Sequence, residues 1–119
     1  MNTSVPSLNP SFAGAVKVLG NKWKLLIVGN LLERPWRFNE LRKSLTGISQ
    51  KVLTTCLRAL EEDKILTRTV FPEIPPRVEY ALTDIGMELK PVIEAMLAFG
   101  EDHSDIFPAP AAEEEEEEN

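Results

Sequence analysis

The chain has 119 residues, of which 43% are hydrophobic and 27% are charged. This length suits one domain with one core, and the composition gives no reason to expect disorder overall. Apolar runs such as Leu25–Val28 are far shorter than the roughly 18 residues of a membrane span. Met1–Asn9 lacks the pattern of a secretory signal. We therefore expect a cytoplasmic protein without a membrane segment.

The net charge of −6 averages two unlike parts of the chain. Nine carboxylates and no Lys or Arg follow from Glu101 onward, which leaves 10 acidic and 13 basic side chains over residues 1–100, a net charge of +3. The predicted organisation is an N-terminal arm (1–10), a folded domain (11–100) and an acidic, disordered tail (101–119). The run Glu113–Glu118 suggests a built-in competitor for a polyanion-binding surface, and a purely solubilising tail is the alternative.

Helices are predicted for the first half of the chain. A short helix is expected near residues 11–19, and the apolar segment 23–32 is predicted to be the central core helix after a break at Gly20-Asn21. Pro35 is expected to end that helix. A third helix covers about 39–45 and closes near Gly47, with Arg42 and Lys43 pointing away from the core.

A fourth helix over about residues 49–63 carries the most informative surface. Ser49 is a candidate N-cap because its hydroxyl can accept from the unpaired amides of the first turn. At helical spacing one arc is apolar and the opposite arc holds hydrogen-bond donors without a carboxylate. The apolar arc contains Val52, Leu53, Cys56, Leu57 and Leu60, and the donor arc contains Lys51, Thr54, Thr55 and Arg58. We expect the first arc to pack and the second to face outward.

Two strands are predicted next, over Leu66–Phe71 and Val78–Leu82, with a Pro-rich tip between them and Arg77 at its base. Alternation places Leu66, Arg68 and Val70 on one side of the first strand, and Val78, Tyr80 and Leu82 on one side of the second. A last helix is predicted from the N-cap candidate Thr83 to about Phe99 or Gly100, bent at Pro91. Its apolar arc of roughly 160° exceeds the roughly 100° stripe that faces a helix's own core, so this helix needs a partner.

This order of elements indicates an α+β fold, mainly helical with a small β-hairpin. It is the order of a winged helix-turn-helix with a C-terminal dimerisation helix. In such a fold the recognition helix, here about 49–63, enters the major groove, and the wing, here about 66–82, lies at the DNA backbone. Residues 17–77 contain 12 basic and six acidic side chains, a net charge of +6, which suits binding to phosphates. A solvated helix face on a basic protein is the alternative interpretation.

Several motifs occur in order and without gaps from about Phe12 to Gly100. They are Gly20-Asn21-Lys22-Trp23, Leu25-Leu26-Ile27, Arg37-Phe38-Asn39-Glu40-Leu41-Arg42, Gly47-Ile48-Ser49-Gln50-Lys51-Val52-Leu53-Thr54, Leu57-Arg58-Ala59-Leu60-Glu61-Glu62-Asp63, Pro75-Pro76-Arg77-Val78-Glu79-Tyr80-Ala81-Leu82-Thr83 and Gly86. Together they resemble the HxlR family of bacterial transcription regulators. The resemblance implies a MarR-like winged-helix homodimer that binds operator DNA, with dimer contacts from the terminal helices.

From the helix pattern and the resemblance, we expect a sequence-specific transcriptional regulator that binds double-stranded DNA as a homodimer. The candidate DNA-binding residues are Arg37, Asn39, Ser49, Gln50, Lys51, Thr54, Thr55, Arg58 and Arg77, with Arg77 at the DNA backbone. The candidate dimer interface comprises Phe12, Val92, Met96 and Phe99.

Two positions depart from the family pattern. Many relatives have a Cys-Pro pair before the first helix, which in some acts as a redox or electrophile sensor. Asn9-Pro10 stands at the matching place, so that sensing thiol is missing. Cys56 lies in the apolar arc, where a buried small hydrophobe is expected rather than a sensor. Lys64 stands where relatives usually have Gly after the recognition helix, so that turn must accommodate a side chain.

Other function classes have weaker support. No enzyme is expected, because the single His, His103, lies in the acidic segment without a nucleophile to activate. No cofactor or metal is expected, since one Cys and one His cannot assemble a zinc cluster. A winged-helix protein-interaction module without specific DNA binding is the alternative function. A small-molecule effector, apolar in character, in a dimer interface lined by Phe12, Trp23, Met96 and Phe99 is left open.

Overall fold

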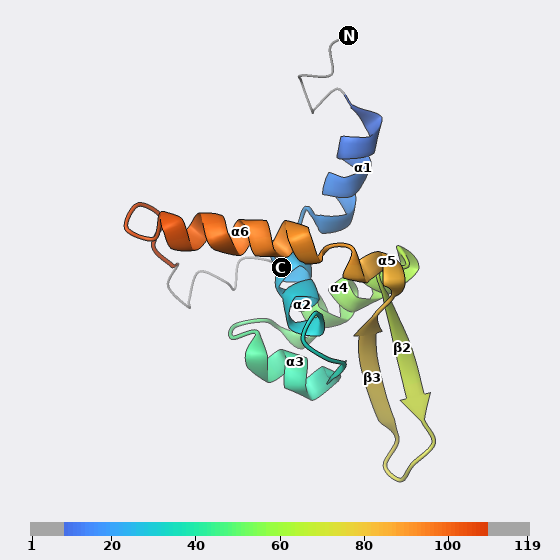
Figure 1. Ribbon diagram of the computed structural model, residues 1–119. Helices are drawn as coiled ribbons and strands as arrows, with labels where there is room; N and C mark the ends of the chain where they lie inside the picture. Colours follow the sequence, from blue (N-terminus) through green and yellow to red (C-terminus); the bar gives the residue numbers. More distant parts are fainter. Residues whose placement is uncertain (1–8, 110–119) are drawn as a thin grey trace.

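The structure is a computed structural model that describes residues 9–109. Its elements are α1 (Pro10–Leu19), α2 (Lys22–Leu31), β1 (Trp36–Arg37), α3 (Phe38–Ser44), α4 (Gln50–Glu62), β2 (Leu66–Phe71), β3 (Arg77–Leu82), α5 (Asp84–Met87) and α6 (Lys90–Asp102) (Figure 1). Within residues 9–109, no helix is both long and apolar enough to cross a membrane. The acidic run 113–118 and most of the predicted N-terminal arm lie outside the described residues.

Polar side chains cap the helices at the predicted places. Ser49 Oγ accepts from the Val52 N–H at 3.1 Å, and Thr83 Oγ1 accepts from the Gly86 N–H at 3.0 Å. Both predicted N-caps are therefore confirmed. Asn21 caps α2 in the same way, so the chain breaks at Gly20-Asn21 and restarts as a new helix.

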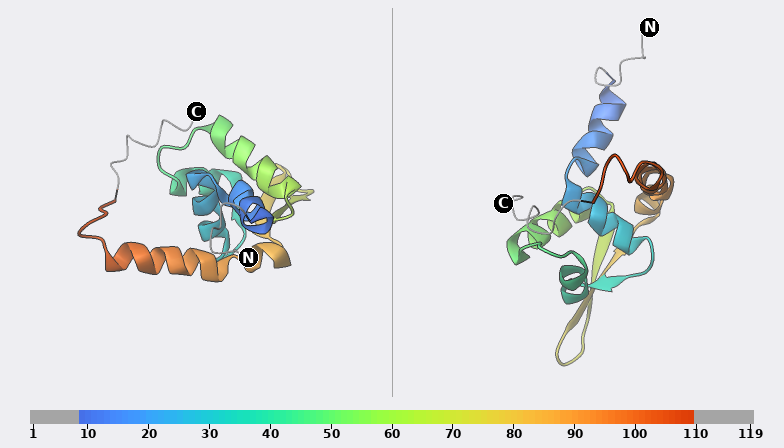
Figure 2. Two further views of the ribbon diagram at one scale, coloured as in Figure 1. Left: turned by 90° about the horizontal axis from the view of Figure 1, so that it is seen from above. Right: turned by 90° about the vertical axis from the view of Figure 1, so that its left-hand side faces the viewer.

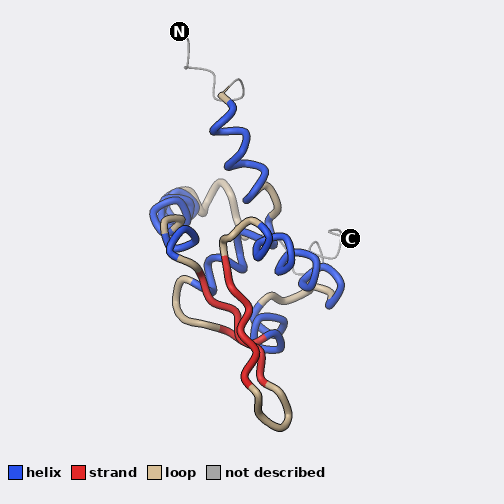
Figure 3. The backbone as a smooth tube through the Cα atoms, turned by 90° about the vertical axis from the view of Figure 1, so that its right-hand side faces the viewer, coloured by secondary structure: helices blue, strands red, loops and turns tan. Residues whose placement is uncertain are grey.

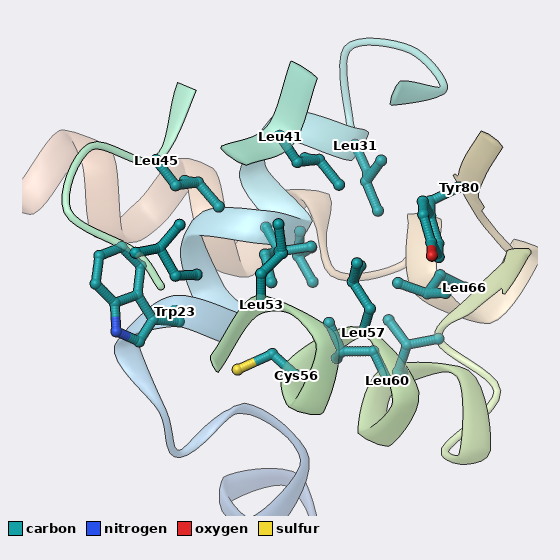
Figure 4. Packing of buried hydrophobic residues seen from close by; sticks show 14 residues of the cluster. Trp23, Leu31, Leu41, Leu45, Leu53, Cys56, Leu57, Leu60, Leu66 and Tyr80 are labelled. Carbon is teal, nitrogen blue, oxygen red and sulfur yellow. The ribbon is translucent and has the colours of Figure 1, made fainter. Parts of the chain in front are cut away.

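The core lies where α2, α3 and α4 meet the sheet (Figure 4). Its buried side chains are Trp23, Ile27, Val28, Leu31, Leu41, Leu45, Ile48, Leu53, Cys56, Leu57, Leu60, Ile65, Leu66 and Tyr80. Full burial of one such aliphatic side chain stabilises a protein by about 1.5–3 kcal/mol. The four buried side chains of α4 thus fix the orientation of that helix, and the predicted packing arc is confirmed.

The sheet is antiparallel, with the strand order β1-β3-β2. Its hairpin register pairs Leu66 with Leu82, Arg68 with Tyr80 and Val70 with Val78, which confirms the predicted sides of both strands. β1 was not predicted, because two residues show no periodicity. It pairs Trp36 with Tyr80 and so joins the connection between α2 and α3 to the wing. Figure 3 shows the hairpin extending away from the helices.

The prediction of one bent helix from Thr83 to Gly100 is wrong. The segment forms α5 and α6, which are separate helices joined through Glu88 and Leu89. Pro91 lies in the first turn of α6, where no intrahelical amide donor is needed. It therefore helps to begin a helix instead of bending one.

The folded part of the chain also passes the predicted boundary at residue 100. α6 continues to Asp102, and in the next turn the Ile106 and Phe107 N–H groups both donate to the His103 carbonyl oxygen at 2.9 Å. The Phe107 ring stacks on Phe99, with 5.9 Å between ring centroids. The first residues of the predicted tail thus extend α6 and fold back on it.

Candidate nucleic-acid interface

α4 presents the predicted donor arc on its outer side. Lys51, Thr55 and Arg58 are exposed, and Thr54 is half-buried. The opposite side chains are buried in the core, so this outer face cannot rotate away. No carboxylate occurs in α4 before Glu61. The face can donate hydrogen bonds to base edges or phosphates without an internal acceptor that competes.

The first turn of α4 holds two further predicted DNA-binding residues. Gln50 is exposed, whereas Ser49 is half-buried at the N-cap. Ser49 Oγ already accepts from the Val52 N–H, so its hydroxyl retains only its O–H as a donor and one acceptor site. Helix capping is the interaction of Ser49 that this structure records.

The outer side of α3 brings together predicted and unpredicted residues. Arg37 and Asn39 are exposed at the start of α3. A hollow of about 370 Å³ is lined by Asn39, Arg42 and Lys43. Arg42 and Lys43 were predicted to be exposed but were missing from the candidate DNA-binding set. Two adjacent cations on the helix before α4 are the signal that could have identified them.

Glu40 holds the start of α3 in place. Its Oε1 accepts from the Arg37 N–H at 2.9 Å and pairs with Arg34 Nη1 at 3.2 Å. The backbone hydrogen bond from Arg37, followed by the Arg34 hydrogen bond, lowers the pKa of Glu40. The Glu40 carboxylate therefore interacts with groups at the start of its own helix, and it fixes the position of the Arg37 backbone.

A second hollow, of about 380 Å³, lies between α4 and the sheet. Its lining residues are Phe38, Thr54, Leu57, Arg58, Glu61, Arg68 and Tyr80. Arg68 Nε lies 3.7 Å from Glu61 Oε1, and burial raises the pKa of Tyr80. Arg58 thus extends along the edge of a hollow whose other cation is already paired.

Arg77, which was predicted to contact the DNA backbone, lies in acidic surroundings. Arg77 Nη2 lies 2.8 Å from Glu73 Oε2, and Nη1 lies 2.6 Å from Glu79 Oε2. Its guanidinium carbon also lies 3.8 Å from the centroid of the Phe71 ring. The hydrogen bond from Arg77 lowers the pKa of Glu73. Two carboxylates neutralise this cation, so it braces the base of the wing tip.

The other surface of interest is apolar. Of the predicted interface residues, Phe12 is 50% exposed, Val92 44%, Met96 51% and Phe99 59%. α6 uses its other side to pack on the core, and α1 projects from the domain (Figure 2). Large apolar side chains at this exposure mark an interaction surface.

Trp23 does not belong to that apolar surface. Its side chain is 1% exposed and lies beside Leu45 in the core (Figure 4). Its Nε1 atom is buried and, within the described residues, has no hydrogen-bond partner. The expectation that Trp23 lines an effector site is therefore wrong, and the lining set reduces to Phe12, Met96 and Phe99.

A family model described as HxlR-like helix-turn-helix matches residues 18–106. The match includes every helix and strand from α2 to α6. The chain belongs to the HxlR-like family. One HxlR-like relative is YdeP, an HTH-type transcriptional regulator of Bacillus subtilis strain 168. It is 43% identical over 88 residues, which cover 74% of this chain and 69% of YdeP.

Solved structures support the same assignment. The redox regulator HypR in its reduced form superposes with a TM-score of 0.76 at 38% identity, over 80% of this chain and 94% of HypR. A MarR-family transcriptional regulator of Porphyromonas gingivalis W83 superposes with a TM-score of 0.75 at 31% identity, over 87% of this chain and 96% of that one. The predicted family and the winged-helix, MarR-like fold are confirmed, and the family is one of transcriptional regulators.

The two predicted departures from the HxlR pattern have clear structural settings. Asn9 Oδ1 accepts from the Ser11 N–H at 2.8 Å and the Phe12 N–H at 3.2 Å, so this position caps α1 where a thiol was expected in relatives. Cys56 is 4% exposed, as predicted. Lys64 has φ 66°, a left-handed conformation that favours glycine.

Proposed function

We propose that this protein is a sequence-specific regulator of transcription in the cytoplasm that binds duplex DNA as a homodimer. One observation carries the proposal: α4 exposes Lys51, Thr55 and Arg58 on a face that is rigidly backed by the core and free of carboxylates. Such a helix fits the major groove, where Lys and Arg donate to guanine O6 and N7. The HxlR-like family assignment supports the same function.

The proposed roles follow the position of each side chain. Lys51, Thr54, Thr55 and Arg58 read base edges, while Ser49 and Gln50 contact DNA at the start of α4. Arg37, Asn39, Arg42 and Lys43 contact the phosphates from α3. Arg77 holds the wing tip in shape and contributes little net charge, because Glu73 and Glu79 flank it.

The homodimer is proposed from the apolar surface on α1 and α6. Phe12, Val92, Met96 and Phe99 are each at least 44% exposed, and burial of apolar area favours association at about 25 cal/mol per Å² before the costs of binding. A two-fold dimer predicts a palindromic operator whose half-sites are about one helical turn, roughly 34–36 Å, apart. A small apolar effector between the protomers is compatible with this surface.

The test compares Arg58→Ala with Lys90→Ala on the duplex of highest affinity selected from a random library. If Arg58 reads a base, its loss should weaken binding by about 1–3 kcal/mol, roughly 5- to 150-fold, and relax preference at one position. Lys90→Ala removes the same charge from α6, so affinity should change by no more than about twofold. A doubly substituted Lys51→Ala, Arg58→Ala protein that binds as tightly as the unmodified protein would refute the proposal.

The alternative is a winged-helix module that binds only proteins. A salt-dependent gel shift on duplex DNA distinguishes the two functions. The regulator should lose affinity steeply as salt rises, with a slope that reflects the phosphates it neutralises. Absence of any DNA binding at low salt would favour the interaction module.

A further inference from the structure

Four cations on two consecutive helices have no carboxylate partner. We call Arg42, Lys43, Lys51 and Arg58 the α3–α4 basic surface; all four side chains are exposed. Within residues 9–109, no carboxylate oxygen lies within 4.0 Å of any of them. Arg34, Arg68 and Arg77 are ion-paired, whereas the other cations of residues 9–109 share this lack of a carboxylate partner. A polyanion can therefore bind this surface without first breaking an ion pair.

The chain leaves α6 at a defined point. The stacking of Phe107 on Phe99 and the turn at His103 hold the chain against the end of α6. In Figure 1 and the left panel of Figure 2, this end of α6 and the connection between α3 and α4 both lie toward the left, whereas the right panel of Figure 2 shows α6 and α4 on opposite flanks of the domain. The last described residues are thus held against the end of α6.

The chain beyond this point is long enough to reach the basic surface. Glu118 follows Ala109 by nine residues, an extended-chain limit of about 30 Å. The protein is 25 Å across in its shortest dimension. The later carboxylates of Glu113–Glu118 can thus extend over a distance comparable with this dimension, whereas Glu113, four residues after Ala109, stays within about 13 Å of that residue.

We propose that Glu113–Glu118 binds the α3–α4 basic surface and competes with DNA for it. The inference rests on the proposed function in one respect, which is that DNA is the competitor. Non-specific DNA is held by phosphate contacts alone. The cations that make these contacts are the ones that the acidic segment would bind. Cognate DNA adds base contacts that a run of carboxylates does not reproduce. The base contacts make operator DNA the tighter ligand, but the segment must leave the surface before either DNA binds, so it weakens the binding of both by the same factor.

The expected size of the effect follows from tethering. A short flexible tether gives an effective concentration on the order of 1 mM. If the free segment has a dissociation constant of about 0.25 mM for the surface, occupancy weakens non-specific binding by about fivefold. Added salt screens the pairing over a Debye length of about 8 Å at 0.15 M, so the effect should shrink as salt rises.

The first experiment needs no DNA. Carbodiimide couples a carboxylate to a lysine amine in contact with it, and peptide mass spectrometry of the crosslinked full chain identifies the pair. We expect crosslinks from Glu113–Glu118 to Lys43 and Lys51, lost at high salt. Lys17 on α1 and Lys90 at the start of α6 are internal references. Equal coupling to all four lysines, or none to Lys43 and Lys51, would contradict the proposal.

The second experiment measures DNA affinity for three proteins. They are the full chain, a form lacking residues 110–119, and a form of the same length in which the six glutamates are replaced (E113Q to E118Q). The probes are a short duplex of arbitrary sequence and the duplex of highest affinity selected from a random library, each at about 0.05 M and 0.2 M salt.

Both altered proteins should bind the arbitrary duplex about fivefold more tightly at the lower salt and less than twofold more tightly at the higher salt. Their gain on the selected duplex should be the same factor, because the segment competes equally with any DNA that needs this surface. Unchanged affinities for both probes would overturn the proposal, and so would a gain on deletion that E113Q to E118Q does not reproduce. If no form binds either duplex, the proposed function fails, while the crosslinks still decide whether the acidic segment occupies the basic surface.

Discussion

Replacement of Lys64 by glycine should stabilise the protein, because Lys64 adopts a backbone conformation that a side chain disfavours. Lys64 has φ 66° and follows the last turn of α4. Its N–H donates to the Glu61 carbonyl oxygen at 3.0 Å, and the Ile65 N–H donates to the Leu60 carbonyl oxygen at 2.9 Å. These two bonds form the Schellman helix end, in which the position of Lys64 is the one that most favours glycine.

Two opposing terms set the magnitude for Lys64→Gly. A residue with a Cβ in the left-handed region costs about 1–2 kcal/mol. Glycine offsets part of this stabilisation, because its greater loss of conformational entropy on folding costs about 0.5–1 kcal/mol. The net stabilisation should be about 0.5–1 kcal/mol. For a domain of this size, 1 kcal/mol shifts the melting temperature by roughly 4–8 °C.

Urea denaturation at fixed protein concentration, followed by circular dichroism, measures this change, since the stability of an associating protein depends on concentration. Lys64→Ala is the matched control. It removes the charge beside Glu61 and Glu62 but keeps the Cβ, so it should leave the free energy of unfolding within about 0.5 kcal/mol. If Lys64→Gly and Lys64→Ala have equal stabilities, the left-handed conformation is not the source of strain and the reasoning fails.

Three further predictions concern other parts of the chain. Met96→Asp places a charge on the apolar surface, so sedimentation at micromolar concentration should show a dimer becoming a monomer; a monomer before substitution would contradict the proposed assembly. Gly86→Ala should destabilise the protein by roughly 1–3 kcal/mol in urea unfolding, because a Cβ there would overlap the Ile65 carbonyl oxygen. DNA binding should be indifferent to mild peroxide or aldehyde, since Asn9 caps a helix and Cys56 is 4% exposed. A loss of binding on oxidation that Cys56→Ser prevents would show that the thiol is reached.

Local patterns in the sequence were sufficient to predict α4 and the hairpin. The arc of Leu53, Cys56, Leu57 and Leu60 recurs with the helical period, and the Ser49 cap uses only neighbouring amides. The hairpin register likewise follows from alternation along two adjacent strands. Such features depend on residues close in the chain, so they can be predicted from the sequence without knowledge of the tertiary structure.

Features that depend on distant partners were decided only by the tertiary structure. β1 is a strand because Trp36 pairs with Tyr80 on β3. A strand of two residues is too short to show an alternating pattern in the sequence. Pro91 begins a helix or bends one according to how α5 packs before it. Arg77 and Arg58 have the same formal charge, but only Arg77 is paired with Glu73 and Glu79. Charge and periodicity are properties of the chain, whereas ion pairing and burial are set by which groups the fold brings together.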